Sequence, residues 1–553
     1  MPIINRYSSH HNASAIGVIL KILLFISSLV PGAVLMAAQQ QDNFVAQLNQ
    51  LMEFDFDVKE QAINKLAKSD NERIDAVFRT LLNGDLYYRK NDKTIVYIKK
   101  TDDGYALTSV LGNESLGVVS KRKIKKITVN NKLRQLLSGL LAQRGMSHDD
   151  PAVRLASVKE MIGQLNQSDR DKLEKLLAKE QNNDVIKVLN IAMAMIDVGH
   201  TDKQEQLAAI EVLGESDYPE SRNRLNQVLN QASEAGDTPV VKQAGASLQQ
   251  IQMRAERYQT IETVFFGVSL GSVLLLAAIG LAITFGVMGV INMAHGELMM
   301  IGAYTTYVVQ LLMPNYIEWS LLVAIPAAFV VAGLFGVAIE RGVIRFLYGR
   351  PLETLLATFG ISLVLQQLVR SIFSPLNRSV ITPDWMSDSW EINALLSLTY
   401  NRLYIIVFSL LVFGALLMVL KKTPLGLHVR AVSQNRTMAR AMGIRTEWVD
   451  AMTFGLGSGI AGVAGVALSQ LTNVGPNLGQ AYIIDSFMVV VFGGVGNLWG
   501  TLVGAMSLGI ANKFMEPWVG AVLAKIFILV FIILFIQKRP RGLFPQKGRA
   551  AEN

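Results

Sequence analysis

The stretch GVMGVINMAHGELMMIGAY, Gly286 to Tyr304, joins two apolar segments, and the first of them ends at Phe285. Each segment approaches the roughly 20 mostly apolar residues that a membrane span needs. Polar groups at membrane depth are costly unless they face protein or a water-filled cavity. Asn292, His295 and Glu297 therefore indicate a polar site inside a membrane protein.

The rest of the chain divides by composition into two parts. Of its 553 residues, 51% are hydrophobic and only 17% are charged, whereas a soluble domain has about 25% charged residues. Residues 39–258 are rich in charged and amide side chains, and residues 261–537 consist mainly of aliphatic residues, glycine and phenylalanine. We expect a water-soluble part followed by a membrane part.

The net charge of +8 does not predict a nucleic-acid partner. Lys and Arg cluster in short segments between the apolar runs, as they do in the cytoplasmic loops of membrane proteins. The chain has no cysteine, which excludes disulfides, thiolate catalysis and cysteine-ligated metals. We expect no metal and no cofactor bound by this chain.

Residues 1–38 have the pattern of a secretory signal peptide. Arg6 and Lys21 precede the apolar run Ile22–Ala38, and Pro31-Gly32 would break a helix within it. An uncleaved anchor is the alternative. Both interpretations place residues 39–255 on the outer, periplasmic side of an inner membrane.

The exported part shows two sequence patterns. Residues 39–131 are predicted to be mixed α/β, with short strands in 83–130. Residues 132–255 have helical periodicity and resemble HEAT-like hairpins, paired near 151–178, 183–214 and 219–250. No catalytic group is evident there, since His200 lies in a polar turn, so docking or scaffolding is the expected role.

Residues 256–541 are predicted to form a mostly α, polytopic membrane domain with eight or nine spans, followed by a cytoplasmic tail at 542–553. Candidate spans lie near 261–285, 289–312, 320–340, 352–373, 402–420, 448–470, 481–496, 500–515 and 518–537. Those near 481–515 are short, so they form either two thin spans or one broken hairpin.

The direction of the spans follows from the basic loops. Arginines concentrate near residues 341–350, lysines and arginines near 421–445, and another basic cluster follows the last span at 538–541. All three are expected to be cytoplasmic. Counting backward places residue 258 outside, which agrees with the predicted signal.

The polar residues around the opening stretch fall on two helical stripes. Asn292 and His295 share one, and Glu297 and Tyr304 share another. The first pair could satisfy backbone groups at the glycine-rich turn, or Glu297 and Tyr304 could face a solute pathway. A second glycine-interrupted hairpin, Ile483–Ala505, begins beside Asp485 and suggests an internal repeat with a site between the halves.

INMAHGELMMIGAY resembles the signature of the branched-chain amino acid family of ABC-transporter permeases. RPLETLLATFGISLVLQQLVRSIF (Arg350–Phe373), GLHVRAVSQNRTMARAMGI (Gly426–Ile444) and VVVFGGVGNLWGTLVGA (Val489–Ala505) are similar too. The RPLETLLATFG motif and the exported extension look most like the urea-transporter permease of that family. The resemblance covers most of residues 261–541.

The resemblance implies a second related permease, two ATPase subunits that bind ATP, and an exported solute-binding protein. Membrane lipid is a further expected partner. This chain has no G-x-x-x-x-G-K-[ST] motif and so cannot supply the ATPase. Family position also implies an ATPase-coupling segment, where apolar residues in a basic loop would suit a partner groove. Its candidate residues are Gly426, Arg430, Arg436, Met438, Arg440, Met442, Gly443 and Ile444.

Urea is the expected solute, with a branched-chain amino acid as the alternative. Urea is small and neutral, so its path would need amide, hydroxyl and carboxylate groups. The candidate pathway residues are Asn292, His295, Glu297, Tyr304, Gln366, Gln367 and Asp485. A passive urea channel is disfavoured, because a channel has no need of a coupling segment.

An intramembrane serine hydrolase is the alternative from another class. GVSLG, Gly267 to Gly271, matches G-x-S-x-G, and His295 could act as base for Ser269. That motif normally needs a strand–turn–helix elbow, whereas here it lies inside an apolar helix, where small residues favour helix packing.

Overall fold

The computed structural model describes residues 43–69, 71, 73–101, 104–112 and 114–544. They form two compact units that divide between Ile251 and Gln252, close to the predicted boundary at 255. The predicted signal at 1–38 lies outside the described residues, as does most of the predicted tail.

The first unit begins with helical residues 43–50, two further helices and an antiparallel five-stranded sheet of order β4-β3-β2-β1-β5. Alternate residues point to one face, so Val96, Leu107 and Ile124 meet in a small buried cluster. The elements are α2 (Phe56–Ala67), α3 (Ile74–Asn83), β1 (Leu86–Arg89), β2 (Ile95–Thr101), β3 (Gly104–Ser109), β4 (Ser115–Val119) and β5 (Ile124–Lys126).

A run of helices follows, and the sequence marks where several of them begin. Asn130, Asp150, Asn182 and Asp202 each accept a hydrogen bond from a backbone N–H of the first turn. Apolar faces of successive helices form two adjoining clusters, as in a helical array. These helices are α4 (Asn131–Gly145), α5 (Pro151–Met161), α6 (Arg170–Leu177), α7 (Asn183–Asp197), α8 (Lys203–Gly214), α9 (Pro219–Glu234) and the start of α10 (Thr238–Met288).

The second unit contains a separate helix for each of the nine predicted spans. Within the described residues, six helices are long and apolar enough to cross a membrane, namely α10, α12, α13, α15, α18 and α21, and α19 is a shorter apolar helix. The total of eight or nine spans stays a prediction. The helices are α10, α11 (His295–Leu312), α12 (Ile317–Gly342), α13 (Pro351–Phe373), α15 (Tyr400–Lys422), α18 (Thr446–Ser469), α19 (Leu478–Gly493), α20 (Leu498–Val519) and α21 (Ala521–Lys538).

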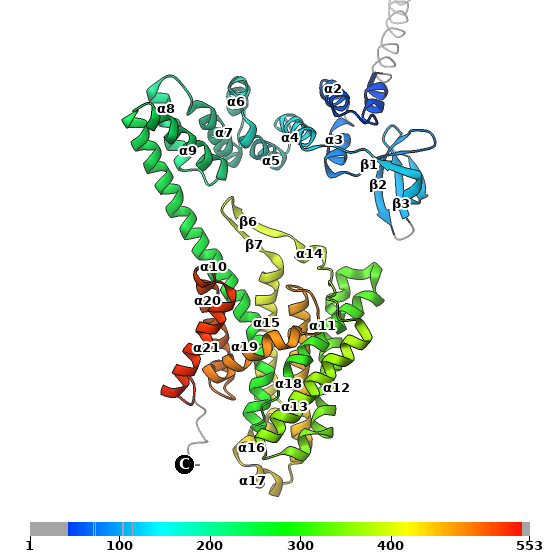
Figure 1. Cartoon of the computed structure of the whole chain (residues 1–553), viewed down its shortest axis with the longest axis vertical. Helices are drawn as coiled ribbons and strands as arrows, with labels where there is room; N and C mark the ends of the chain where they lie inside the picture. The colour runs from blue at the N-terminus through cyan, green and yellow to red at the C-terminus, as the bar shows by residue number, and fades with distance from the viewer. Residues whose placement is uncertain (1–42, 70, 72, 102–103, 113, 545–553) are drawn as a thin grey trace, which may run out of the picture. The chain divides into compact units, whose positions relative to one another are not determined.

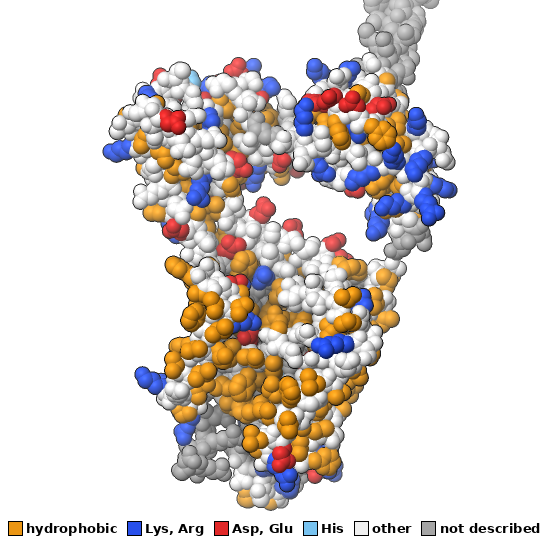
Figure 2. All heavy atoms as spheres, viewed as in Figure 1, with side chains coloured by type: hydrophobic (Ala, Val, Ile, Leu, Met, Phe, Trp, Pro, Cys, Tyr) orange, Lys and Arg blue, Asp and Glu red, His pale blue; other side chains and the backbone are white. Residues whose placement is uncertain are grey.

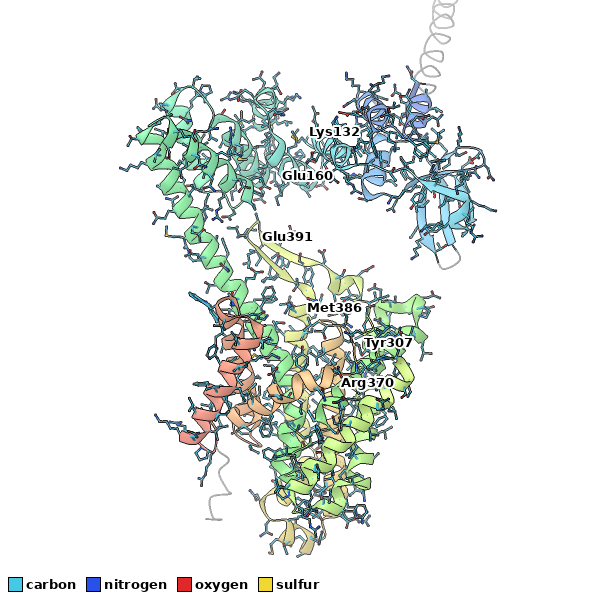
Figure 3. All side chains as sticks on the ribbon, in the orientation of Figure 1. Lys132, Glu160, Tyr307, Arg370, Met386 and Glu391 are labelled. Carbon is cyan, nitrogen blue, oxygen red and sulfur yellow. The ribbon has the colours of Figure 1, made fainter. Side chains whose placement is uncertain are left out.

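Shorter elements lie at the two ends of this unit (Figure 1). At one end are α14 (Asp384–Ser387) and the hairpin of β6 (Ser389–Asn393) and β7 (Leu396–Thr399). Met386 on α14 and Glu391 on β6 are labelled in Figure 3. At the other end are α16 (Pro424–Gln434) and α17 (Arg436–Ala441), within the basic loop that the sequence places in the cytoplasm.

Backbone-to-backbone packing forms the centre of the second unit. A Cβ added to Gly302 of α11 would lie 2.0 Å from the Gly462 carbonyl oxygen of α18, and one added to Gly465 would lie 1.9 Å from that of Met299. Only glycine permits such an approach. In contrast, α12, α13, α15 and α21 expose many large apolar side chains, and hydrophobic side chains cover much of the visible face of this unit in Figure 2.

Candidate solute pathway and coupling segment

The turn before α11 is held by its own polar side chains. Gly289 has φ +67°, and Asn292 Oδ1 accepts the N–H of Ala294 at 3.0 Å. His295 Nε2 donates to the carbonyl oxygen of Ala277 on α10 at 2.9 Å. Asn292 therefore bonds a backbone group at the turn, whereas His295 bonds a backbone group within α10.

Glu297 lies two residues after His295, in the first turn of α11, and is buried. Its Oε1 accepts hydrogen bonds from Ser362 Oγ at 3.0 Å and from Gln366 Nε2 at 2.7 Å, both on α13. Gln366 Nε2 also donates to Ser362 Oγ at 3.3 Å. We name Glu297, Ser362 and Gln366 the polar layer. Glu297 Oε2 has no hydrogen-bond partner among the described residues, so the layer can accept one more donor.

The α13 side of this layer is part of a longer polar stripe. One polar side chain recurs every four residues, so each member lies beside the next in a stripe that winds gradually around the helix. The four residues nearest the start are buried, and Arg370, labelled in Figure 3, donates to Asn477 Oδ1 at 2.8 Å. Residues of the stripe are Thr354, Thr358, Ser362, Gln366 and Arg370. Sequence reasoning missed Thr358 and Ser362, although the spacing was visible.

The other predicted pathway residues lie outside the polar layer. Tyr304 is buried with its ring centroid 4.8 Å from that of Phe373, and its hydroxyl has no hydrogen-bond partner among the described residues. Gln367 is exposed, because it faces away from Gln366 on the same helix. Asp485 on α19 forms an ion pair of 2.8 Å with Lys525 on α21.

The serine hydrolase alternative is wrong in its geometry. Ser269 is buried within α10, and His295 bonds to Ala277 of the same helix, eight residues further on. At about 1.5 Å per residue, that separates the two sites by roughly 12 Å. Cβ atoms added at Gly267 and Gly271 would lie 2.7 Å and 2.9 Å from backbone atoms of α20, so GVSLG is a helix-packing face.

In the predicted coupling segment, three arginines bind within this chain. Arg436 pairs with Asp450 of α18 and stacks on Tyr348, with its Cζ 3.9 Å from the ring centroid. Arg430 Nη1 donates to the Leu420 carbonyl at 3.0 Å, and Arg440 Nη2 donates to Thr446 Oγ1 at 3.2 Å. These arginines hold α16 and α17 against the neighbouring spans.

The apolar residues of the same segment are exposed. Leu427, Met438 and Met442 expose 59%, 60% and 80% of their surface. Gly443 follows α17 with φ +86°, a conformation that favours glycine, and a Cβ on Gly426 would lie 2.0 Å from the Leu420 carbonyl oxygen. A cavity of about 580 Å³ lies beside α16. The arrangement presents an apolar surface on a fixed loop.

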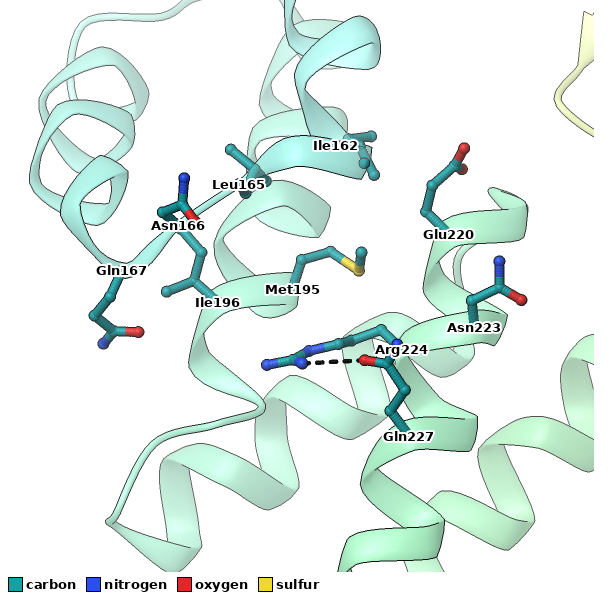
Figure 4. A pocket seen from close by; sticks show the side chains of 11 residues that line it. Ile162, Leu165, Asn166, Gln167, Met195, Ile196, Glu220, Asn223, Arg224 and Gln227 are labelled. Carbon is teal, nitrogen blue, oxygen red and sulfur yellow. Dashed lines mark hydrogen bonds between the residues drawn. The ribbon is translucent and has the colours of Figure 1, made fainter. Parts of the chain in front are cut away.

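The first unit has a polar cavity of about 320 Å³ between α7, α9 and the loop before α6 (Figure 4). Glu220, Asn223, Arg224 and Gln227 line it at helical spacing on α9, and Arg224 Nη1 donates to Gln227 Oε1 at 3.3 Å. The described residues contain no group of three or more His, Asp or Glu that could hold a metal ion.

Comparison with known proteins assigns the second unit to a protein family. The family described as branched-chain amino acid transport system / permease component matches residues 263–536. The high-affinity branched-chain amino acid transport system permease protein LivH of Escherichia coli K12 is 31% identical over 293 residues, covering 51% of this chain and 94% of that protein. The chain belongs to this permease family. It is therefore a multi-pass inner-membrane protein and the permease component of an ABC transporter.

Two further relatives show the breadth of the likeness. The permease protein BraD of Pseudomonas aeruginosa, also of a high-affinity branched-chain amino acid transport system, is 29% identical over 297 residues, covering 52% of this permease chain and 96% of BraD. The ribose import permease protein RbsC of Haemophilus influenzae is 24% identical over 255 residues, covering 44% and 74%. No solved structure matches.

Proposed function

We propose that this permease imports a small organic solute, driven by ATP hydrolysis on two separate ATPase subunits. A second related permease and an exported solute-binding protein would complete the transporter. The observation that carries the proposal is the polar layer, because a buried carboxylate with an unused oxygen among apolar helices is a functional feature by default. Residues 39–255 would lie on the periplasmic side.

A branched-chain amino acid is the solute that the comparisons favour. LivH and BraD are both described as permeases of branched-chain amino acid transport systems, and the matches cover almost their whole length. Import of leucine, isoleucine or valine by this chain follows by analogy with them.

Urea is the second candidate, and the chemistry of the polar layer favours it. Glu297, Ser362 and Gln366 offer a carboxylate, a hydroxyl and an amide, and no hydrogen bond to them comes from Lys or Arg. A zwitterionic amino acid would need a positive group for its carboxylate, and the arginine of the polar stripe, Arg370, already donates to Asn477. Urea is neutral and needs only hydrogen-bonding groups, and the RPLETLLATFG resemblance points the same way.

The test is uptake of labelled urea and labelled leucine by cells with and without this gene, before and after ATP depletion. Loss of ATP-dependent urea uptake alone would support urea, and loss of leucine uptake alone would support the amino acid. If deletion changed neither, the import proposal would fail for both solutes.

A further inference from the structure

A cavity of about 500 Å³ lies where α12 ends and α18 begins. No residue of the polar layer lines it, nor do the exposed Met438 and Met442, but three of the candidate coupling residues do. Its lining comes from the end of α12, the end of α17, the segment that follows α17 and the first turn of α18. Its lining residues are Arg341, Arg440, Gly443, Ile444, Arg445, Thr446, Glu447 and Trp448.

The charge of this cavity is strongly positive. Arg341, Arg440 and Arg445 line it, against one lining carboxylate, Glu447. That carboxylate is already engaged by Arg345 at 3.2 Å, from outside the lining. Arg341 Nε lies 3.7 Å from the buried Glu340 Oε2. Guanidinium groups from three elements therefore surround the space, and among the described residues Arg440 and Arg445 form no ion pair with a carboxylate.

The same cavity opens onto an apolar, exposed strip. Trp448 is 55% exposed and Met452, one turn further along α18, is 38% exposed, although most of α18 is buried. α12 ends at Gly342 and α18 starts at Thr446, so the strip runs from the basic cavity into the span. Tryptophan is enriched at this membrane–water interface.

We propose that this cavity binds the phosphate group of an anionic phospholipid of the cytoplasmic leaflet. Arginine forks bind phosphate oxygens in pairs of hydrogen bonds, and basic pockets between spans on the cytoplasmic side suit lipid head groups. An acyl chain would lie along Trp448 and Met452. Free phosphate has the same head-group chemistry, but it has no acyl chain to contact Trp448 and Met452. The inference does not depend on which solute is carried.

The test compares lipid retention by the full chain purified in detergent micelles that contain phosphatidylglycerol and phosphatidylcholine, measured by native mass spectrometry. R341Q/R445Q should lower retention of phosphatidylglycerol at least fivefold and leave phosphatidylcholine unchanged. K421Q/K422Q removes two exposed cytoplasmic charges elsewhere and should stay within twofold of the unmodified chain. R341K/R445K keeps the charge but loses the planar fork, so it should retain an intermediate amount, and it keeps the test usable if the glutamine variant misfolds.

A second arm adds inorganic phosphate to the chain in phosphatidylcholine alone. Weak or undetectable binding there, with tight phosphatidylglycerol retention, supports the lipid. Inorganic phosphate that binds well and displaces phosphatidylglycerol would overturn the lipid as occupant. Equal phosphatidylglycerol retention in R341Q/R445Q and in the unmodified chain would overturn the proposal, and a loss of ATPase association in that variant would then assign the cavity to a protein contact.

Discussion

Glu297 is the residue on which the proposed pathway most depends. Replacing it with Ala removes the acceptor that Ser362 and Gln366 share, so the buried Ser362 hydroxyl loses this partner and Gln366 Nε2 keeps only its bond to Ser362 Oγ. We expect E297A to lower solute uptake at least tenfold, and E297Q to lower it less, because the amide oxygen can still accept. The measurement is uptake at equal protein levels.

Gln367→Ala is the matched control for this prediction. Gln367 is exposed and makes no side-chain bond to the polar layer, so uptake should remain near normal. Unimpaired transport by E297A would show that the polar layer is purely structural and would remove it from the pathway.

Gly302 gives a prediction about stability. A methyl group there would meet the Gly462 carbonyl oxygen at 2.0 Å, so α11 and α18 would have to separate. We expect G302A to destabilise the chain by about 1–3 kcal/mol through overpacking, measured as a lower Tm of the purified protein. Gly360→Ala is the control, because nothing lies within 4 Å of a Cβ at that position of α13. A Tm of G302A equal to that of G360A would count against the close packing.

At the scale of elements, the end of α17 gives a prediction about coupling to the ATPase subunits. Met442 is exposed beside a loop that arginines hold in place. We expect M442D to reduce copurification of the ATPase subunits at least fivefold, because a charge would enter an apolar contact. Thr437→Asp adds the same charge at another exposed position of α17 and should have a smaller effect. If M442D bound the ATPases as well as the unmodified chain, this surface would not be the coupling site.

An ion pair between two elements of the first unit gives a pH prediction. Arg154 on α5 holds both carboxylate oxygens of Glu180, before α7, at 2.7 Å and 2.8 Å. That bond, with backbone N–H donors, lowers the pKa of Glu180 from 4.5 to about 2. Because the folded-state pKa is depressed, this stabilisation is complete above 4.5 and disappears as pH falls through about 2.

The variant E180Q should therefore cost about 2 kcal/mol near neutral pH, since it removes charge-assisted hydrogen bonds. The difference from the unmodified chain should shrink as pH falls from 4.5 to 2. Hydrogen exchange of residues 151–190 in the full chain, corrected for the intrinsic rate at each pH, measures it. A difference that stayed constant over this range would contradict the ionic origin.

The sequence predicted the positions of the helices better than it predicted the contacts between them. Span lengths and glycine-rich turns are local, so each predicted span overlaps one helix for most of its length, although the span predicted at 289–312 is helical only from His295. The partnership of Glu297 with Ser362 joins two helices 65 residues apart, which no local pattern encodes. The ion pair between Arg436, a candidate coupling residue, and Asp450 of α18 was not predicted. Gln366 and Gln367 looked equivalent in the sequence. They differ because the orientation of α13 buries Gln366 and exposes Gln367.

At the scale of the whole molecule, the absence of cysteine makes the proposed topology directly testable. Ser233→Cys and Thr437→Cys introduce single thiols at exposed positions of the two units. A membrane-impermeant thiol reagent should label Ser233→Cys in cells whose outer barrier is opened, and Thr437→Cys only after the inner membrane is broken. Labelling in the opposite order would reverse the orientation, and equal labelling of both before lysis would refute the assignment of opposite sides.

The glycine contacts between α11 and α18 have a mechanical consequence. Two helices that touch through carbonyl oxygens and Cα atoms have no side chains to rotate aside, so their spacing is fixed. The pair therefore behaves as a stationary frame on one side of Glu297. α13 faces that frame through a few hydrogen bonds that a water or a passing solute could exchange. We therefore expect α13 to be the helix that moves during transport. The hinges are expected in the segments that join it to α12 and to β6.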